Sequence, residues 1–228
     1  MKTQLRSSVV SHVCGIALLS LFTAHAQGPW LYTPFYVKAD FGGTFTQDTD
    51  LKEFFGENTS GARVKFDPGF RLGFTGGLLV TDWFAAELET GVMERGIDSI
   101  TGPSSVDATL SQVPFLLNAR FQFPNESRFR PYLGGGLGVA AAVLDAGHID
   151  FGMTQWHGSQ SDAVFAYQAF AGLRYALNDR AGVCLEYHYF GTSAPEWRVD
   201  SRYGVFPDRM SFGRIDTHAF SIAFDYRF

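Results

Sequence analysis

The last ten residues are the most constraining stretch of the sequence, because they alternate strictly between two kinds of side chain. Phe220, Ile222, Phe224, Tyr226 and Phe228 share one face, and the residues between them are small, polar or charged. A period of two is the pattern of a β-strand with one apolar face. In water, such a row of aromatic side chains would be an aggregation hazard. A strand whose large side chains face lipid and whose smaller ones face a lumen has no such problem.

The beginning of the chain has the pattern of a secretory signal peptide. Lys2 and Arg6 form a basic region, an apolar stretch follows, and Ala24–Ala26 supplies the small residues that a signal peptidase reads. The apolar stretch is shorter than the roughly 20 residues that a membrane-spanning helix needs, which disfavours an anchor. We therefore expect residues 1–26 to be a signal peptide and residues 27–228 to form the exported domain, a β-barrel.

The composition narrows the class of protein further. Removing residues 1–26 leaves 16 basic and 23 acidic residues, so the exported chain is acidic and nucleic acid is not an expected partner. One cysteine remains, Cys184, which excludes an intramolecular disulfide. The sequence holds 23 Phe, 9 Tyr, 4 Trp and 25 Gly residues, and beyond the signal peptide no apolar run is long enough for a spanning helix. In an exported chain this composition favours a membrane β-barrel over a soluble domain.

Eight segments have the alternation expected of membrane-crossing strands, which need about 9–11 residues. They are residues 35–45, 70–80, 84–92, 113–123, 133–143, 165–177, 183–189 and 219–228. An even number of strands is typical of closed bacterial barrels. The sequence therefore predicts an all-β fold, an eight-stranded antiparallel up-and-down transmembrane β-barrel.

The connections between these segments alternate in length. The short ones are rich in turn-forming residues and lie at 81–82, 124–130 and 178–180. The long ones are polar or mixed and lie at 46–66, 96–109, 145–162 and 191–214. This asymmetry predicts short periplasmic turns and four long outer loops. Aromatic residues gather near the turns, among them Trp83, Tyr132 and Tyr175, where we expect an interfacial girdle.

Alternation alone does not say which face lies inside, since a soluble β-sandwich or a lipocalin-like barrel buries its apolar face. Here the polar face carries mostly Gly, Ala and few bulky residues, as a narrow lumen requires. The apolar face is too aromatic on all the segments to fit inside an eight-stranded barrel. We therefore expect the polar face to point inward and the apolar face to meet lipid.

The inward face then carries equal numbers of basic and acidic side chains. They are Lys38, Asp40, Arg71, Glu87, Glu89, Arg120, Arg174, Glu186, Asp225 and Arg227. Charges crowded into a narrow barrel must pair, because an isolated one loses its hydration. We expect a network that acts as a plug; the alternative is a proton or ion relay. Gly134, Gly136 and Gly138 also point inward, and we expect them to make room for long Arg and Glu side chains from across the barrel.

No constellation in the sequence predicts catalysis or metal binding. The histidines of the exported chain, His148, His157, His188 and His218, fit no metal-ligand spacing. In the outer-membrane lipid A deacylases a His and a Ser lie two positions apart on one strand, whereas Ser193 lies five positions after His188. Cys184 is expected to be a small packing residue. We expect no catalytic residue, no metal and no cofactor.

Two parts of the chain have recognisable motifs: Arg130–Gly138, and Tyr167–Tyr175 with the Asn178-Asp179 turn and Leu185–Tyr187. They resemble a strand segment and a hairpin of small outer-membrane barrels of the OmpA membrane-domain, OmpX and opacity-protein type. Phe224, Tyr226 and Phe228 resemble the C-terminal signal that the barrel assembly machinery reads. The resemblance implies a location in the outer membrane of a Gram-negative bacterium. No C-terminal peptidoglycan-binding domain accompanies it, so cell-wall tethering is not implied.

These patterns favour a structural or surface-recognition role of the adhesion type, with any binding carried by the outer loops. The fourth loop holds Trp197, Arg202, Tyr203 and Phe206, and aromatic and Arg side chains favour binding hot spots; the alternative is that this loop packs on its neighbours and caps the barrel. Outer-membrane lipid, lipopolysaccharide and the assembly machinery are the expected partners of a monomer, beside an unknown surface ligand. The other candidate functions are a narrow porin-like channel and a lipid A-modifying barrel enzyme.

Overall fold

The computed structural model describes residues 35–54, 57–59, 61–101, 105–150, 155–198 and 209–228. The predicted signal peptide lies outside these residues. Within them, no helix is long and apolar enough to cross a membrane.

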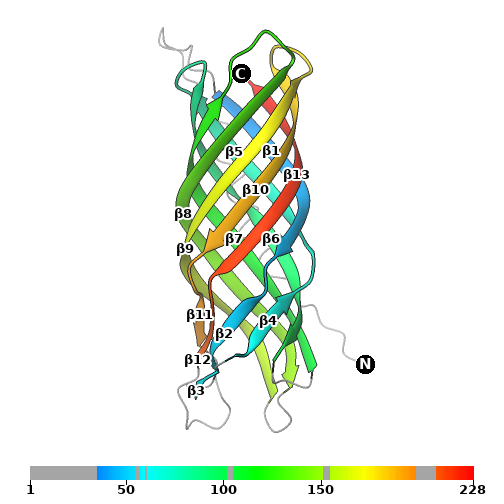
Figure 1. The fold of residues 1–228 in the computed structure, drawn as a ribbon, viewed down its shortest axis with the longest axis vertical. Coiled ribbons are helices and arrows are strands. Elements are labelled where there is room, and N and C mark those ends of the chain that lie inside the picture. The colour runs from blue at the N-terminus through cyan, green and yellow to red at the C-terminus, as the bar shows by residue number, and fades with distance from the viewer. Residues whose placement is uncertain (1–34, 55–56, 60, 102–104, 151–154, 199–208) are drawn as a thin grey trace, which may run out of the picture. The chain divides into compact units, whose positions relative to one another are not determined.

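Eight long antiparallel strands form a closed barrel (Figure 1). They are β1 (Phe35–Thr46), β5 (Gly69–Leu79), β6 (Phe84–Ile100), β7 (Ser105–Gln122), β8 (Phe129–Asp150), β9 (Gln155–Ala176), β10 (Ala181–Thr192) and β13 (Ile215–Arg227). Each strand pairs with its neighbours, and β1 pairs with β13 from Tyr36↔Arg227 to Thr46↔Thr217. This last pairing closes the sheet, so the barrel has no free edge. The predicted fold class is confirmed.

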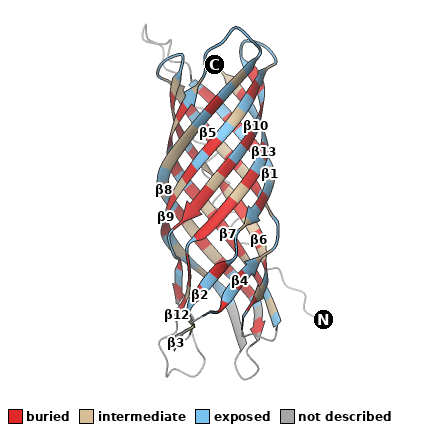
Figure 2. Ribbon diagram, in the orientation of Figure 1, coloured by how far each residue is buried: buried red, intermediate tan, exposed pale blue. Residues whose placement is uncertain are grey.

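Burial alternates along every long strand, as Figure 2 shows. The large apolar side chains point outward, and Phe41, Leu88 and Ile222 are 64%, 68% and 65% exposed. Between them the inward side chains, such as Lys38 and Glu87, are buried. We call the eight ranges 35–45, 70–80, 84–92, 113–123, 133–143, 165–177, 183–189 and 219–228 the membrane band. Its outward face is the apolar surface that a bilayer would cover.

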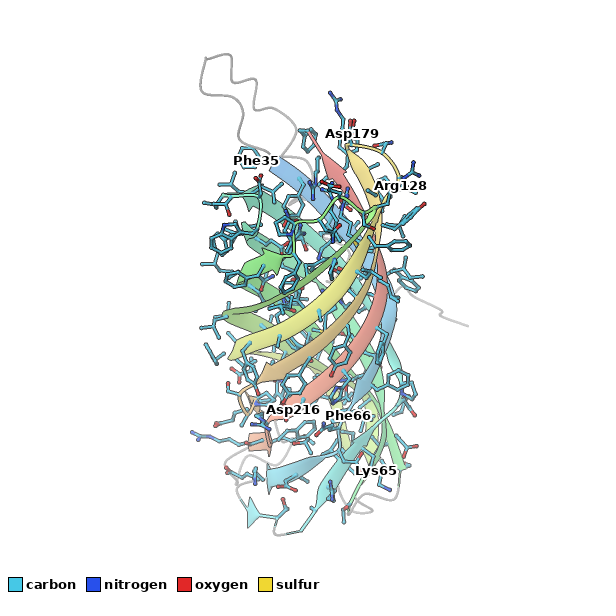
Figure 3. All side chains as sticks on the ribbon, turned by 45° about the horizontal axis from the view of Figure 1, so that its top comes forward. Phe35, Lys65, Phe66, Arg128, Asp179 and Asp216 are labelled. Atoms are coloured by element: carbon cyan, nitrogen blue, oxygen red, sulfur yellow. The ribbon has the colours of Figure 1, made fainter. Side chains whose placement is uncertain are left out.

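The two ends of the barrel differ. Short connections at 80–83, 123–128 and 177–180 lie at the same end as Phe35, Arg128 and Asp179, whereas Lys65 and Asp216 lie at the opposite end (Figure 3). The third connection is a tight turn, because the Asn178 side chain accepts hydrogen bonds from the backbone N–H groups of residues 180 and 181 at 2.9 and 2.7 Å. The predicted short turns are present, and we call this the turn end.

The predicted long loops at 96–109 and 145–162 are mostly strand, which corrects the sequence prediction. β6 continues to Ile100, and β8 continues to Asp150. Buried and exposed residues still alternate in these stretches, but the buried positions are now apolar and the exposed ones polar. Ile97, for example, is buried while the neighbouring Asp98 is exposed. A prediction based on outward-facing apolar residues therefore ends each strand at the edge of the membrane band, although the strands continue beyond it.

Short strands complete the end opposite the turns. They are β2 (Thr49–Phe54), β3 (Glu57–Asn58), β4 (Arg63–Phe66), β11 (Glu196–Arg198) and β12 (Arg209–Phe212). The order β11-β12-β2-β4-β6 joins four of them to the barrel sheet, and β3 pairs with β2. Together with residues 93–100, 105–112, 144–150 and 155–164 of the long strands they form what we call the outer extension. The predicted loops 46–66 and 191–214 therefore also contain strands.

Candidate functional site in the barrel interior

Ion pairs fill the part of the interior nearest the turn end. Arg174 Nε lies 2.8 Å from Asp225 Oδ1, and Arg120 Nη1 lies 3.2 Å from Glu87 Oε1. The hydroxyl of Tyr36 donates a hydrogen bond to the same Glu87 oxygen. All five side chains are buried. Each charge has therefore lost its hydration and depends on its partner.

A second group of charges lies further along the lumen. Lys38 Nζ is 2.5 Å from Glu186 Oε1, and Arg71 is shared between Asp40 at 2.7 Å and Glu89 at 2.5 Å. Lys38 and Asp40 come from β1, whereas their partners Glu186 and Arg71 come from β10 and β5, and Glu89, the second partner of Arg71, comes from β6. Neutral polar side chains add further hydrogen bonds. Asn118 and Gln168 donate to Glu89 Oε2, the oxygen that Arg71 does not bind, and Tyr132 donates to Glu186 Oε1, the oxygen that Lys38 also binds.

Nine of the ten side chains expected in the lumen are buried, and each of the nine has an oppositely charged partner within 3.2 Å. The tenth, Arg227, is only partly buried near the turn end, and its Nε and Nη2 have no hydrogen-bond partner among the described residues. The structure thus brings together all the expected residues except Arg227.

Two interior tyrosines were missed by the sequence analysis. Tyr132 was expected in the interfacial girdle, but it is 3% exposed and points into the lumen. Tyr36 is 1% exposed and lies against Gly77 of the neighbouring strand, where a Cβ would be 2.1 Å from the Tyr36 ring. Gly172 leaves the same space for Tyr132. An inward Tyr opposite a Gly on the paired strand is the signal that identifies such residues.

The inward glycines of β8 make room for different side chains than expected. A Cβ at Gly134 would lie 2.4 Å from the ring of Phe170, and one at Gly136 would lie 1.8 Å from Asn118 Oδ1. At Gly138 it would meet the backbone oxygen of Phe115 at 2.0 Å. These glycines therefore allow close packing of Phe170, Asn118 and a neighbouring backbone, and not of Arg or Glu side chains.

One interior group has the spacing of metal ligands. Donor atoms of Asp40, Glu186 and His188 all lie within 4.8 Å of one another, and all three residues are buried. The sequence did not reveal this group, because β1 and β10 are brought together only by the strand between them. Both carboxylates already bind cationic side chains, namely Arg71 and Lys38. The arrangement is therefore that of an ion-pair network to which the His188 ring adds a contact of 3.4 Å with Glu186.

The interior of the outer extension is apolar. Its side chains form one continuous cluster that we call the outer core: Leu51, Ala62, Val64, Met93, Ile97, Ile100, Ala108, Leu110, Leu116, Ala140, Ala142, Leu144, Ala146, Ile149, Val164, Ala166, Phe190, Trp197, Met210, Phe212 and Ile215. The charged network and the outer core together fill the lumen from the turn end to the outer extension, within the described residues.

Trp197 was expected as a loop contact, and the structure corrects this. It is fully buried in the outer core, where its Nε1 donates to the backbone oxygen of Ala142 at 2.9 Å and its ring packs edge-on against Phe212. Burial of this large ring leaves none of it for an external partner, and agrees with the alternative that the segment caps the barrel. The other expected contact residues, Arg202, Tyr203 and Phe206, lie outside the described residues.

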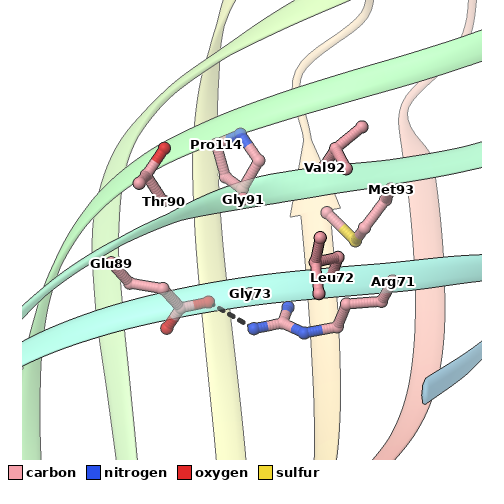
Figure 4. Close-up of a pocket in the computed structure, with 9 residues that line it drawn as sticks. All are labelled: Arg71, Leu72, Gly73, Glu89, Thr90, Gly91, Val92, Met93 and Pro114. Atoms are coloured by element: carbon pink, nitrogen blue, oxygen red, sulfur yellow. Dashed lines mark hydrogen bonds and ion pairs between the residues drawn. The ribbon is translucent and has the colours of Figure 1, made fainter. Parts of the chain in front are cut away.

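The barrel wall has one interruption in its ladder between β6 and β7. The pairing Thr90↔Phe115 is followed by Met93↔Gln112, with no pair between them. Pro114 lies in this gap, and proline has no N–H to donate. The residues around this gap include Gly73, Gly91 and Pro114, and they leave no space large enough for a water molecule (Figure 4).

The C-terminal residues expected to guide assembly line the outside of the barrel. Phe224 is 52% exposed and Phe228 is 71% exposed, whereas Tyr226 is partly buried. Tyr226 packs edge-on against Phe228. The three side chains form an aromatic patch at the turn end, and their role in assembly stays a prediction.

Comparisons with known proteins agree with this architecture. The outer membrane protein OprG of Pseudomonas aeruginosa superposes with a TM-score of 0.64 at 18% identity, over 86% of this chain and 96% of that one. Neisserial surface protein A gives a TM-score of 0.52 at 15% identity over 85% and 97%, and the outer membrane protein AlkL gives 0.53 at 19% over 89% and 94%. A search of curated proteins found no match. The family model for the outer membrane protein beta-barrel domain matches residues 14–228. The chain therefore belongs to the outer membrane protein β-barrel family.

Proposed function

We propose that this protein is a non-conducting barrel in the outer membrane of a Gram-negative bacterium, with a structural or surface-recognition role. The observation that carries the proposal is the filled lumen. Buried ion pairs occupy the membrane band, and the outer core occupies the outer extension. An eight-stranded barrel is narrow enough for side chains to fill it, and the buried side chains of the described residues support a closed lumen.

Single-channel recording in planar bilayers tests the closed lumen. The native protein should give no conductance steps. The double variant Lys38→Ala/Glu186→Ala removes a buried pair without leaving either charge alone, and it should give more openings than the native protein. Stable conductance from the native protein would exclude the non-conducting barrel.

The recognition role is supported by the outer extension. Its strands carry the outer connections beyond the membrane band, and its exposed face is polar, with Lys52, Asp50, Arg209 and Glu196 about half exposed or more. Lipopolysaccharide surrounds such a surface in an outer membrane, and we propose it as a partner of the outer extension. At this edge Asp216 lies 2.7 Å from Arg214 Nη2, and its hydrogen bond raises the pKa of the Arg214 guanidinium.

Labelling of intact cells tests which end faces outward. A Lys52→Cys variant should react with a membrane-impermeant maleimide, whereas Cys184 of the native protein is buried and should not. Reaction at an Asp179→Cys variant in place of Lys52→Cys would place the outer extension in the periplasm and refute the recognition role. We propose no catalysis, and loss of acyl chains from lipid A incubated with the purified protein would contradict this.

A narrow channel is the second candidate, and the interrupted β6–β7 ladder favours it. Restoring an N–H with Pro114→Val allows the missing pairs to form. If the native protein does conduct, this variant should conduct less. Equal conductance from both would show that the interrupted β6–β7 ladder does not contribute to conduction.

A further inference from the structure

Arg95 differs from the other fully buried cations of the interior. Lys38, Arg71, Arg120 and Arg174 each have a carboxylate partner, but among the described residues no carboxylate pairs with Arg95. Arg95 is 2% exposed, and its Nε and Nη1 have no hydrogen-bond partner. Burying an unpaired charge is strongly unfavourable, so Arg95 lowers the stability of the fold in a way that the paired charges of the membrane band do not.

Among the described residues, the groups that contact Arg95 carry no negative charge. Nη2 of Arg95 donates to Gln112 Oε1, and Gln112 in turn donates to Thr192 at 3.3 Å. The ring of Phe66 lies 5.5 Å from the guanidinium carbon. All of these groups are neutral, so they hold the guanidinium in place without balancing its charge.

Arg95 lies within the outer core, on the same strand as a member of the charged network. On its own strand Glu89 belongs to the charged network, whereas Met93 and Ile97 on either side of Arg95 belong to the outer core. A ligand for this position must therefore offer a negative group to the guanidinium and an apolar part to the side chains around it. Met93 and Met210 are the members of the cluster whose flexible side chains can best change rotamer to make room.

We propose that Arg95 anchors a binding site for a small amphiphilic carboxylate, such as a medium-chain fatty acid. Its carboxylate accepts hydrogen bonds from the free guanidinium nitrogens, and its alkyl chain displaces side chains of the outer core, first Met93 and Met210, because these side chains fill the interior when no ligand is bound. Charge-assisted hydrogen bonds of this kind are the strong ones, and the site is shielded from water. This inference goes beyond the proposed function, since a closed structural barrel needs no ligand.

The test uses the purified barrel in lipid nanodiscs and a medium-chain fatty acid that carries a photoreactive group at its tail end. Peptides that contain Leu144 or Phe190 should be labelled. Arg95→Met removes the charge and keeps an apolar side chain of similar length, and it should reduce labelling about tenfold or more. Arg209→Met is the matched control, because it removes an exposed Arg of the same extension and should leave labelling unchanged.

A second probe separates the charge from the tail. The corresponding photoreactive alcohol should label the native protein much less than the acid, a comparison that needs no variant to fold. Equal labelling by alcohol and acid, or by Arg95→Met and the native protein, would overturn the proposal. Competition by chloride or acetate as strong as that by unlabelled fatty acid would identify an inorganic anion site and would also overturn it.

Discussion

The membrane band and the outer extension are built from the same strands, but the apolar side chains point outward in the first and inward in the second. On β6, Glu87 and Glu89 are buried and Leu88 is 68% exposed within the membrane band. A few residues further along the same strand, Ile97 is buried and Asp98 is exposed. The backbone geometry does not change between the two regions, so the medium outside the barrel decides which face is apolar.

The two interiors are consequently stabilised in different ways. In the membrane band the outward face takes the large apolar residues, and the inward face is held by pairing between buried charges. In the outer extension the outside is polar, and burial of apolar side chains stabilises the interior as in a soluble protein. This contrast predicts how substitutions in each region should behave.

Breaking a buried pair in the membrane band should have the largest effect. Glu186→Gln leaves Lys38 unpaired in the lumen, and we expect a loss of about 3–5 kcal/mol in the free energy of unfolding. Denaturant titration in lipid vesicles measures it. Arg209→Ala breaks an exposed pair with Glu196 as the control, and a loss as large as that of Glu186→Gln would refute the contrast.

Trp197→Ala should be comparably damaging in the outer extension, for a different reason. Truncating this fully buried ring leaves a cavity in the outer core, and such changes cost about 3–5 kcal/mol. The same titration measures the change. A loss below about 1 kcal/mol would mean that the segment does not cap the barrel.

A charged residue placed on the outer face should separate the two regions directly. Ile222→Arg faces lipid and should cost about 2–4 kcal/mol near the bilayer centre. Ser159→Arg faces outward in the outer extension and should change stability by no more than about 0.5 kcal/mol. Unfolding of both variants in one lipid gives the comparison, and equal costs would show that the outer extension is also in contact with lipid.

A smaller effect is expected at the close contact between Gly172 and Tyr132. The added Cβ of Gly172→Ala would lie 2.4 Å from the Tyr132 ring, so the ring must move. Overpacking of this kind costs about 1–3 kcal/mol. Gly76→Ala is the control, because nothing lies within 4 Å of its added Cβ. Equal stability of the two variants would contradict the inward position of Tyr132.

Much of the membrane band could be predicted from the sequence, because alternation is a local property. The segments, their outward faces and the short turns follow from residues that lie two apart. The outer extension could not be predicted in the same way, since Ile97, Leu110 and Leu144 fit the opposite pattern. Trp197 and Tyr132 were assigned to surfaces because their residue types favour interfaces, yet each has an interior polar partner.

The sequence by itself determined the membrane-crossing strand segments, which face of each segment points to lipid, and the set of charges that face the lumen. Only the tertiary structure decided which charges meet, because Lys38 and Glu186 lie on different strands and are brought together by register and closure. The same closure leaves Arg95 without a carboxylate partner in the part of the chain that the structure describes. Periodicity is encoded along the chain, whereas pairing across a lumen depends on where distant strands lie when the barrel closes.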